Sequence, residues 1–478
     1  MLALIVTALL SASVHLLGAG AVAVEPVPPE VTAVVPPGPG GAGVTGGADV
    51  LATPAVVDHG PAASCAGTTV PEPSVAPDCL ADLGSADEAT VRAWAEGLDP
   101  VGDDASSLVA GLGELVDPGG TAAWWASLSP ERQALLTEVA PGVVGNLDGL
   151  PYAVRDGANR AALSRAVLAL AARAGTGDAG RDDPDRVVML QQVLAALQDT
   201  TAGGGERGLL SLDTVLPGRA AVVVGDLQHA DDVTVLVPGM LFTVTGQLVD
   251  WSETAGHLQD EQRRWASRLD GGQAADTVAV VAWMGYRTPD LSNFYTLDLA
   301  RTGADHLERT LDGLDASRRG DAARVTVVAH SYGSSTAMLA LSTHRVTVDS
   351  LVLLGSPGSA VAGAGDLAVR GHDVYAGAGS FDPVAGSAFF GPDPGAGAFG
   401  AVVLHTGGAT DPVTRAQLGA ALGHNDYLRP GTETLRDAAL VGLGRGDLVD
   451  GHERSPGTPP PSTPGLGLVR PQDLWLRD

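Results

Sequence analysis

The chain has 478 residues and a formal net charge of −28, and all 28 of its basic residues are arginine. A chain of this length usually divides into two or three regions around at least one sizeable core. The acidic charge leaves no basic face for phosphate contacts, which argues against nucleic acid as a partner.

The first 84 residues predict export rather than a packed domain. Residues 1–24 carry no charge and end in the small residues of Ala21–Ala23, which is typical of a secretory signal peptide. A retained membrane anchor is the first alternative and a cytosolic N-terminal helix the second. Residues 25–84 are rich in Pro and Gly and predict a flexible linker. Cys65 and Cys79 have no accompanying histidines, so we expect a disulfide formed in an oxidising compartment, with the protein secreted or attached to the cell envelope.

A helical region is predicted over residues 85–205. Apolar residues recur at helical spacing from Val91 onward, and Ser129-Pro130 places a capping residue before a proline at the first helical position. The glycines at 203–205 end the pattern. At the other end of the chain, residues 451–478 predict an extended tail.

Residues 208–450 alternate short β-branched runs with helical stretches, which predicts an α/β domain with a mostly parallel sheet covered on both faces. The predicted strands are 221–224, 233–237, 277–281, 325–328, 351–354, 374–375 and 402–404, and the predicted helices are 252–269, 299–314 and 334–341.

Ser331 stands at the sharpest local motif of the chain. A buried run ends in Ala329-His330-Ser331-Tyr332-Gly333 and leads directly into an apolar helix. This is the pattern of a nucleophile elbow, Gly-x-Ser-x-Gly, with Ala329 at the first glycine position. Small residues are needed because the backbone must bend sharply to raise the serine oxygen above the sheet. Ser331 is therefore the candidate nucleophile, although an ordinary glycine-eased turn remains the alternative.

The acid of a serine triad is expected after the nucleophile in the chain, and the base after the acid. Asp382 follows the short run at 374–375 and is the candidate acid. Asp411, in a second Asp-Pro-Val, is its main competitor, and Asp426 is the third choice.

His424 lies on a glycine-preceded loop after the last predicted strand and is the candidate base. Among the competing histidines, His330 sits inside the elbow beside the nucleophile, and His405 ends a strand and suits a structural role.

Backbone N–H groups should form the oxyanion hole, one from Tyr332 and one from the loop after the run at 233–237. Met240 is the expected second donor, with Leu241 or Gly239 as alternatives. Trp283 and Tyr286 follow the next strand and either line the substrate pocket or pack in the core. Metal-binding and phosphate-loop motifs are missing from the sequence, so we expect no metal and no cofactor.

Several segments resemble a large actinobacterial α/β-hydrolase family of unassigned substrate, and the lack of lysine with 64 glycines suits such a GC-rich genome. The resemblance runs from Trp124 to Tyr427 and is carried by Trp-Trp-Ala-Ser-Leu-Ser-Pro at 124–130, Gly-Asn-Leu-Asp-Gly-Leu-Pro at 145–151, Arg-Asp-Gly-Ala-Asn-Arg at 155–160, Trp-Met-Gly-Tyr at 283–286, the elbow, Asp-Pro-Val at 382–384 and His-Asn-Asp-Tyr at 424–427. Ala329 departs from the family's usual glycine. The resemblance implies an α/β-hydrolase fold preceded by an all-helical region, and a Ser-Asp-His triad.

The expected function is that of a serine hydrolase cleaving a carboxylic ester, of a lipid or a small molecule, through an acyl-serine intermediate. An acyltransferase of envelope lipids would use the same triad, and a catalytically idle interaction module would keep only the fold. Membrane or cell-envelope association is a further possibility.

Overall fold

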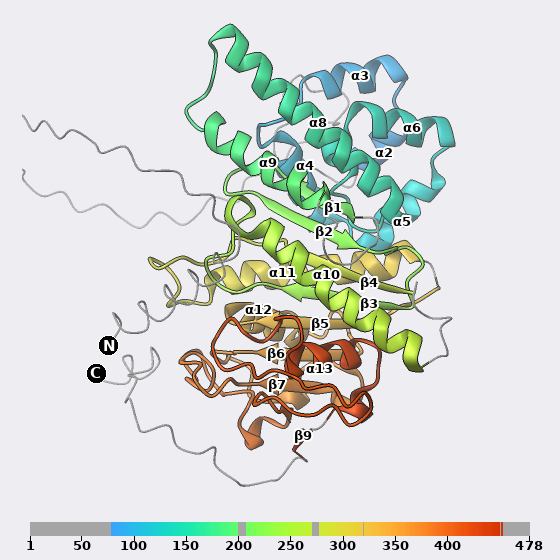
Figure 1. Cartoon of the computed structure of the whole chain (residues 1–478). Coiled ribbons are helices and arrows are strands. Elements are labelled where there is room, and N and C mark those ends of the chain that lie inside the picture. The colour runs from blue at the N-terminus through green and yellow to red at the C-terminus, as the bar shows by residue number, and fades with distance from the viewer. Residues whose placement is uncertain (1–77, 199–206, 270–276, 319, 450, 453–478) are drawn as a thin grey trace, which may run out of the picture.

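Short apolar runs, several of which lead into a helix, assemble into one sheet (Figure 1). The computed structural model describes residues 78–198, 207–269, 277–318, 320–449 and 451–452. Within these ranges nine strands lie in the order β1-β2-β4-β3-β5-β6-β7-β8-β9. They are β1 (Arg207–Asp213), β2 (Arg219–Val224), β3 (Asp232–Val237), β4 (Val278–Met284), β5 (Arg324–His330), β6 (Ser350–Leu354), β7 (Val374–Gly377), β8 (Val402–Leu404) and β9 (Gly451–His452).

The sheet is mostly parallel, as predicted. Strands β4, β3, β5, β6, β7 and β8 run parallel to one another, whereas β2 is antiparallel to both of its neighbours and β9 is antiparallel to β8. Every predicted strand run overlaps an observed strand. Strand β1 was not predicted, because its sequence Arg-Gly-Leu-Leu-Ser-Leu-Asp has no β-branched residue.

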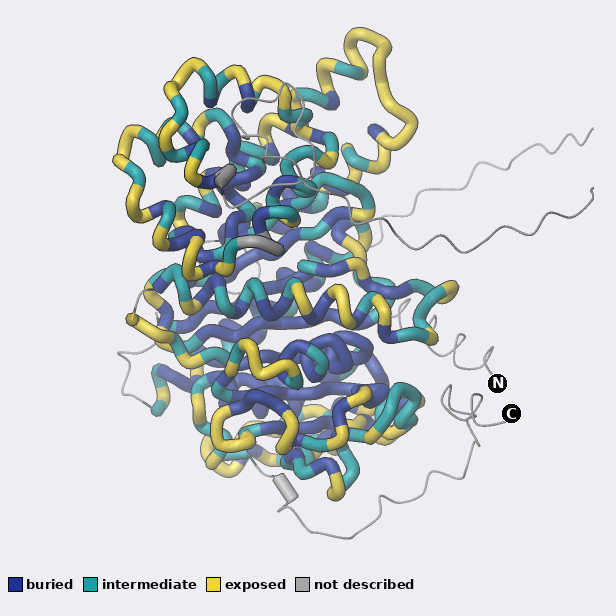
Figure 2. Tube along the Cα trace, turned by 180° about the vertical axis from the view of Figure 1, so that it is seen from behind, coloured by how far each residue is buried: buried dark blue, intermediate teal, exposed yellow. Residues whose placement is uncertain are grey.

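Helices cover both faces of the sheet, and the strands between them are buried (Figure 2). Helices α11 (Asp298–Arg318) and α12 (Tyr332–Ser342) pack on one face, and α10 (Val244–Leu269) and α13 (Glu433–Gly442) on the other. Alternate residues of one strand serve the two cores, since Val235 of β3 belongs to the first and Leu236 to the second. Short 3-10 turns lie between the later elements: η1 (Ala364–Asp366), η2 (Arg370–His372), η3 (Gly397–Phe399) and η4 (Gly446–Leu448).

Helix α10 begins eight residues before the predicted start at Ser252, and α13 was not predicted. The first turn of α10 contains a β-branched residue and Gly246, which lower helix propensity. Thr243 compensates, because its Oγ1 accepts a hydrogen bond of 3.0 Å from the Gly246 N–H and so caps the helix.

The helical region lies at the β1–β2 end of the sheet (Figure 1). It consists of α2 (Asp78–Ser85), α3 (Glu88–Glu96), α4 (Asp104–Leu115), α5 (Pro118–Ser127), α6 (Pro130–Val139), α7 (Pro141–Val144), α8 (Tyr152–Thr176) and α9 (Asp183–Gln198). Ser129 caps α6 by accepting from the Arg132 N–H at 3.3 Å, which confirms the predicted helix start. Leu163 of α8 and Leu190 of α9 share a core with Leu209 of β1, so this region continues the hydrophobic interior of the sheet.

One predicted boundary is wrong. The linker was expected to reach residue 84, but α2 already begins at Asp78, because Leu80 and Leu83 are buried in the core of the helical region. The predicted signal peptide or anchor at 1–24, the Cys65 end of the predicted disulfide and the tail beyond His452 lie outside the described residues. In the part of the chain that the structure describes, no helix is both long and apolar enough to span a membrane.

Candidate active site

Ser331 occupies the sharp turn between β5 and α12. Its backbone has φ 56° and ψ −129°, a left-handed conformation that is unusual for a residue with a side chain and typical of a strained nucleophile elbow. The Ser331 N–H donates to the Leu354 carbonyl at 2.8 Å, and the Ser334 hydroxyl donates to the Ser331 carbonyl at 2.6 Å.

The small residues of the motif are needed because the backbone is closely packed around the turn. Only glycine fits at position 333, since a Cβ there would lie 2.4 Å from the Pro238 carbonyl oxygen. Ala329 is fully buried in the core, so a methyl group fits at the first motif position.

The structure brings the three predicted triad residues together. The Nε2 atom of His424 lies 2.8 Å from the Oγ of Ser331, and its Nδ1 lies 2.9 Å from each carboxylate oxygen of Asp382. Asp382 follows β7 and His424 follows β8, so both reach the elbow from loops at the carboxyl edge of the sheet. All three residues are buried, with exposed fractions of 3%, 8% and 6% for Ser331, Asp382 and His424. Buried groups in this arrangement can pass a proton from hydroxyl to imidazole.

The carboxylate of Asp382 is held in its ionised form. Burial raises its pKa, but hydrogen bonds from His424, Tyr427 and the Val384 N–H outweigh burial and keep the pKa at about 2. An ionised acid at this position orients the imidazole and stabilises its positive charge when it takes a proton.

The two competing aspartates have other partners. Asp411 is buried and accepts a hydrogen bond of 2.8 Å from the Arg436 guanidinium, so its carboxylate is committed to an ion pair. Asp426 accepts from the Gly423 N–H at 2.7 Å and pairs with Arg429 at 3.0 Å, which makes it a local turn residue.

Neither competing histidine contacts the Ser331 hydroxyl. His405 pairs with Glu433 at 2.7 Å. His330 donates its Nε2–H to the His424 carbonyl at 2.7 Å, because a carbonyl oxygen can only accept. Burial, with repulsion from His424, lowers the pKa of His330 to about 3, so it stays neutral beside the base. His330 therefore helps to hold the loop that carries His424.

Tyr427 is a site residue that the motif search did not single out, although it closes the His-Asn-Asp-Tyr block. Its hydroxyl donates to Asp382 Oδ2 at 2.5 Å and accepts from the Gly379 N–H at 2.8 Å. Burial and the Asp382 charge raise the pKa of Tyr427, so the phenol remains a donor. Tyr427 thus holds the carboxylate that also binds His424.

Tyr427→Phe is expected to lower the free energy of unfolding by about 2 kcal/mol at pH 7, since a hydrogen bond to a buried charge is lost. The lowered pKa of Asp382 stabilises the fold above about pH 4, and this contribution fades as the pH falls toward 2. The stability difference between wild type and variant should therefore be constant above about pH 4 and narrow as the pH falls from 4 toward 2 in urea titrations. The rate of reaction with a fluorophosphonate or a nitrophenyl ester probe should fall about tenfold.

Tyr375→Phe is the matched control. Tyr375 is also buried and donates to a carboxylate, that of Asp373, at 2.7 Å, but it lies at the other edge of the sheet. A similar loss of stability with unchanged turnover is expected. Equal losses of turnover in both variants would contradict the role assigned to Tyr427.

Gly355 is the second residue that the motif search missed. It follows β6 with φ 62°, and a Cβ at this position would lie 2.9 Å from Asp382 Oδ2 and 3.1 Å from His424 Cε1. A side chain cannot fit there without displacing the acid or the base. Only the coordinates reveal this contact, because the three residues are far apart in the chain.

Gly355→Ala is expected to reduce kcat at least about tenfold by displacing the triad, with a stability cost of about 1 kcal/mol for the positive φ. Gly177→Ala is the control, since Gly177 has φ 81° and no atom within 4 Å of its added Cβ. Thermal melts of both variants measure the loss of stability, and kinetics with a nitrophenyl ester probe measure the loss of kcat. The expectation is wrong if the two variants lose stability alike and both retain full kcat.

The oxyanion-hole candidates meet at the elbow. Tyr332 is the first residue of α12, so its N–H has no acceptor within the helix. Across from it, the backbone of Gly239 approaches so closely that a Cβ would lie 2.6 Å from the Ser331 Cβ. The Leu241 N–H donates to the Pro289 carbonyl at 2.9 Å, which removes Leu241 from the alternatives. In the described ranges, Met240 donates to no backbone carbonyl and stays the candidate second donor.

The predicted pocket role of Trp283 and Tyr286 is wrong. Trp283 is 1% exposed, and its ring stacks on Tyr286 with the centroids 5.7 Å apart, inside the core between the sheet and α11. The Tyr286 hydroxyl donates to the Pro238 carbonyl at 2.7 Å. Both rings therefore pack in the core, and Tyr286 holds the loop after β3 that carries the candidate donor Met240.

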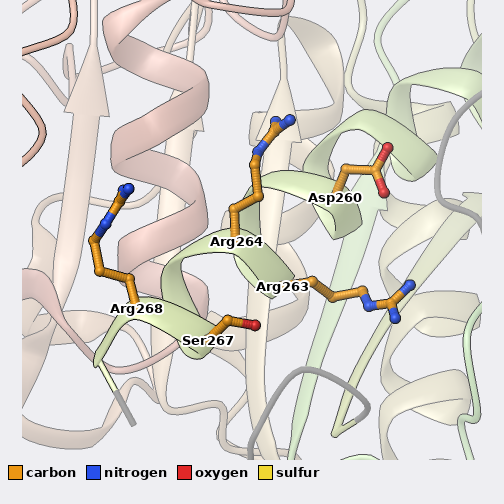
Figure 3. A pocket seen from close by; sticks show the side chains of 5 residues that line it. All are labelled: Asp260, Arg263, Arg264, Ser267 and Arg268. Atoms are coloured by element: carbon orange, nitrogen blue, oxygen red, sulfur yellow. The ribbon is translucent and has the colours of Figure 1, made fainter. Parts of the chain in front are cut away.

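A cavity of about 320 Å³ opens on Ser331 and His424. Its walls come from the loop after β3, one face of α10 and the loop after His424, with Met240, Phe242, Trp251 and Leu428 among the apolar side chains. A larger depression lies further along α10 and is lined by Asp260, Arg263, Arg264, Ser267 and Arg268 (Figure 3), away from the nucleophile. The smaller cavity is therefore the candidate substrate pocket.

Comparisons with known proteins agree with this architecture. A family described as "Alpha/beta hydrolase" matches residues 213–392. The uncharacterized protein Rv2079 of Mycobacterium tuberculosis is 31% identical over 421 residues, covering 74% of this chain, and the chain spans 61% of that relative's length. The uncharacterized protein Mb0988c of Mycobacterium bovis is 36% identical over 187 residues, covering 38% of this chain and 70% of that protein.

Among solved structures, an α/β serine hydrolase without a lid, XC6422 from Xanthomonas campestris, is 15% identical, covers 53% of this chain and 97% of its own, and has a TM-score of 0.30. The family match and the mycobacterial relatives confirm the resemblance found in the sequence, including its unassigned substrate. The chain therefore belongs to the α/β-hydrolase family.

Proposed function

We propose that the protein is a carboxylic ester hydrolase that works through an acyl-serine intermediate. The observation that carries this proposal is the unbroken hydrogen-bond chain from Ser331 Oγ to His424 Nε2, at 2.8 Å, and from His424 Nδ1 to Asp382, at 2.9 Å. A buried chain of this kind activates a hydroxyl that would otherwise be a weak nucleophile.

In the first half of the reaction, Ser331 Oγ bonds to the ester carbonyl carbon while its proton moves to His424 Nε2. The negative charge on the carbonyl oxygen is stabilised by the N–H groups of Tyr332 and Met240. When the carbonyl re-forms, the ester C–O bond breaks and His424 gives its proton to the departing alcohol. Water then attacks the acyl-serine with His424 as base, which releases the acid and restores Ser331.

Fluorophosphonate labelling of the folded chain tests this proposal, because the probe reacts only with an activated nucleophile. The expected result is one adduct, found on Ser331 by peptide mass spectrometry, and its disappearance after heat denaturation. A folded chain without an adduct on Ser331 would favour an idle interaction module. Product analysis with and without glycerol as acceptor separates hydrolysis from acyl transfer to an alcohol.

A further inference from the structure

The active-site cavity has one polar wall, formed by helix α10. Gln247, Asp250, Thr254 and His257 recur at helical spacing and line the cavity on the same face of the helix. Apolar side chains of Met240, Phe242 and Leu428 line the cavity elsewhere, together with polar groups of the loop after His424.

Asp250 stands out on this wall. It is only half-buried, and burial raises the pKa of its carboxyl group. The carboxylate has no hydrogen-bond or ion-pair partner among the described residues, whereas Oε1 of the nearby Gln247 accepts from the Thr243 N–H at 2.9 Å. An acceptor that lines a substrate cavity without a partner of its own is suited to a donor on the substrate.

The position of the cavity indicates which half of an ester would reach Asp250. The cavity wall includes His424, Asn425 and the segment from Tyr427 to Pro430. The protonated imidazole must reach the oxygen of the departing alcohol, so that alcohol leaves on the His424 side of Ser331. The loop after His424 and α10 line one cavity, so an alcohol half that leaves on this side can reach Asp250.

The charges of the wall narrow the chemistry of that alcohol. Two carboxylates, Asp250 and Glu253, face a single arginine, Arg429, which already pairs with Asp426, so the wall disfavours an anionic group such as a phosphate ester. Arg429 and the amide of Asn425 line the same cavity, so donors and acceptors are both present. Hydroxyl groups donate and accept at once, and they match this mixture better than an ammonium group, which only donates.

We infer that the substrate is an ester of a polyhydroxy alcohol and that Asp250 is a specificity residue, accepting a hydrogen bond from a hydroxyl of the alcohol half. This inference rests on the proposed ester hydrolysis by Ser331. Glycerol and sugars carry the required chemistry.

The test compares three esters of one fatty acid, its glyceryl, n-propyl and choline esters, and measures kcat/KM for each with the full chain. Glyceryl and propyl esters share a three-carbon alcohol and differ in hydroxyls, so their ratio isolates hydroxyl recognition. We expect wild type to prefer the glyceryl ester by about tenfold, the value of one good polar contact. In Asp250→Asn the ratio should fall at least about fivefold, mostly through the KM of the glyceryl ester.

Asp260→Asn is the matched control. Asp260 is also a half-buried carboxylate of α10, but it lies with the arginines of the larger depression (Figure 3). It should keep the wild-type ratio. A general destabilisation of Asp250→Asn would lower both activities alike and leave the ratio unchanged, so a misfolded variant cannot imitate the expected result, and Asp250→Ser provides a second test of the ratio.

The inference is overturned if wild type hydrolyses the propyl ester as well as the glyceryl ester, or if the ratio survives in Asp250→Asn. A preference for the choline ester would identify a cation site instead. If no ester is turned over and no fluorophosphonate adduct forms, the proposed function itself has failed, which is a different result from hydrolysis without selectivity.

Discussion

Ser331→Ala is expected to reduce ester turnover by about 10⁶-fold, the loss typical of removing the nucleophile of a serine triad. The hydroxyl supplies the atom that bonds to the substrate, and alanine has nothing to replace it. The variant should fold normally, because it keeps the Cβ and the same strained φ of 56°. Rates with nitrophenyl esters from acetate to dodecanoate measure the effect, and all chain lengths should fall to the same background.

Ser342→Ala is the control for this variant. Ser342 lies at the end of the same helix, and its hydroxyl donates only to the Leu339 carbonyl, at 2.8 Å. Its turnover should stay within about twofold of wild type. Residual activity of Ser331→Ala above about one thousandth of wild type would mean that another group acts as nucleophile.

The sheet and the triad were predictable because each depends on local pattern or chain order. The β-branched runs of β3 and β5 identify buried strands, and small residues around Ser331 identify the elbow. The order acid then histidine after the nucleophile made Asp382 and His424 the leading candidates but left Asp411 open. Their competitors could be rejected only from the coordinates, since the Arg436 partner of Asp411 is 25 residues away in the chain.

Contacts between distant loops could not be predicted. A Cβ at Gly355 would crowd both Asp382 and His424, yet in sequence Gly355 is an ordinary glycine after a strand. Trp283 and Tyr286 end a strand at the correct edge of the sheet, but burial places their rings in the core instead of the cavity. The face of α10 that lines the cavity could not be predicted either, because the helix begins eight residues before its predicted start.

Asp382→Asn is expected to reduce kcat by about 10⁴-fold while the fold survives. The hydrogen bonds around the Asp382 carboxylate determine which of its two oxygen positions the amide nitrogen of asparagine would take. Oδ1 accepts from the N–H groups of Val384 and Ala385, at 2.8 and 3.2 Å, so the amide oxygen must take that position. The amide nitrogen then takes the Oδ2 position, 2.9 Å from His424 Nδ1.

An amide nitrogen at the Oδ2 position can only donate, so it favours the tautomer in which His424 Nδ1 accepts and Nε2 carries the proton. In the other tautomer Nδ1–H would have to share the amide oxygen, also 2.9 Å away, with the N–H groups of Val384 and Ala385. A protonated Nε2 cannot accept the proton of Ser331, although every heavy atom remains in place. The loss should therefore appear in kcat, and fluorophosphonate labelling should slow by a similar factor, with little change in KM. Asp426→Asn, which removes the carboxylate nearest to His424 in sequence, should cost less than about tenfold. The opposite ranking of the two variants would reassign the acid, because Asp426 would then be the group that sets the tautomer of His424.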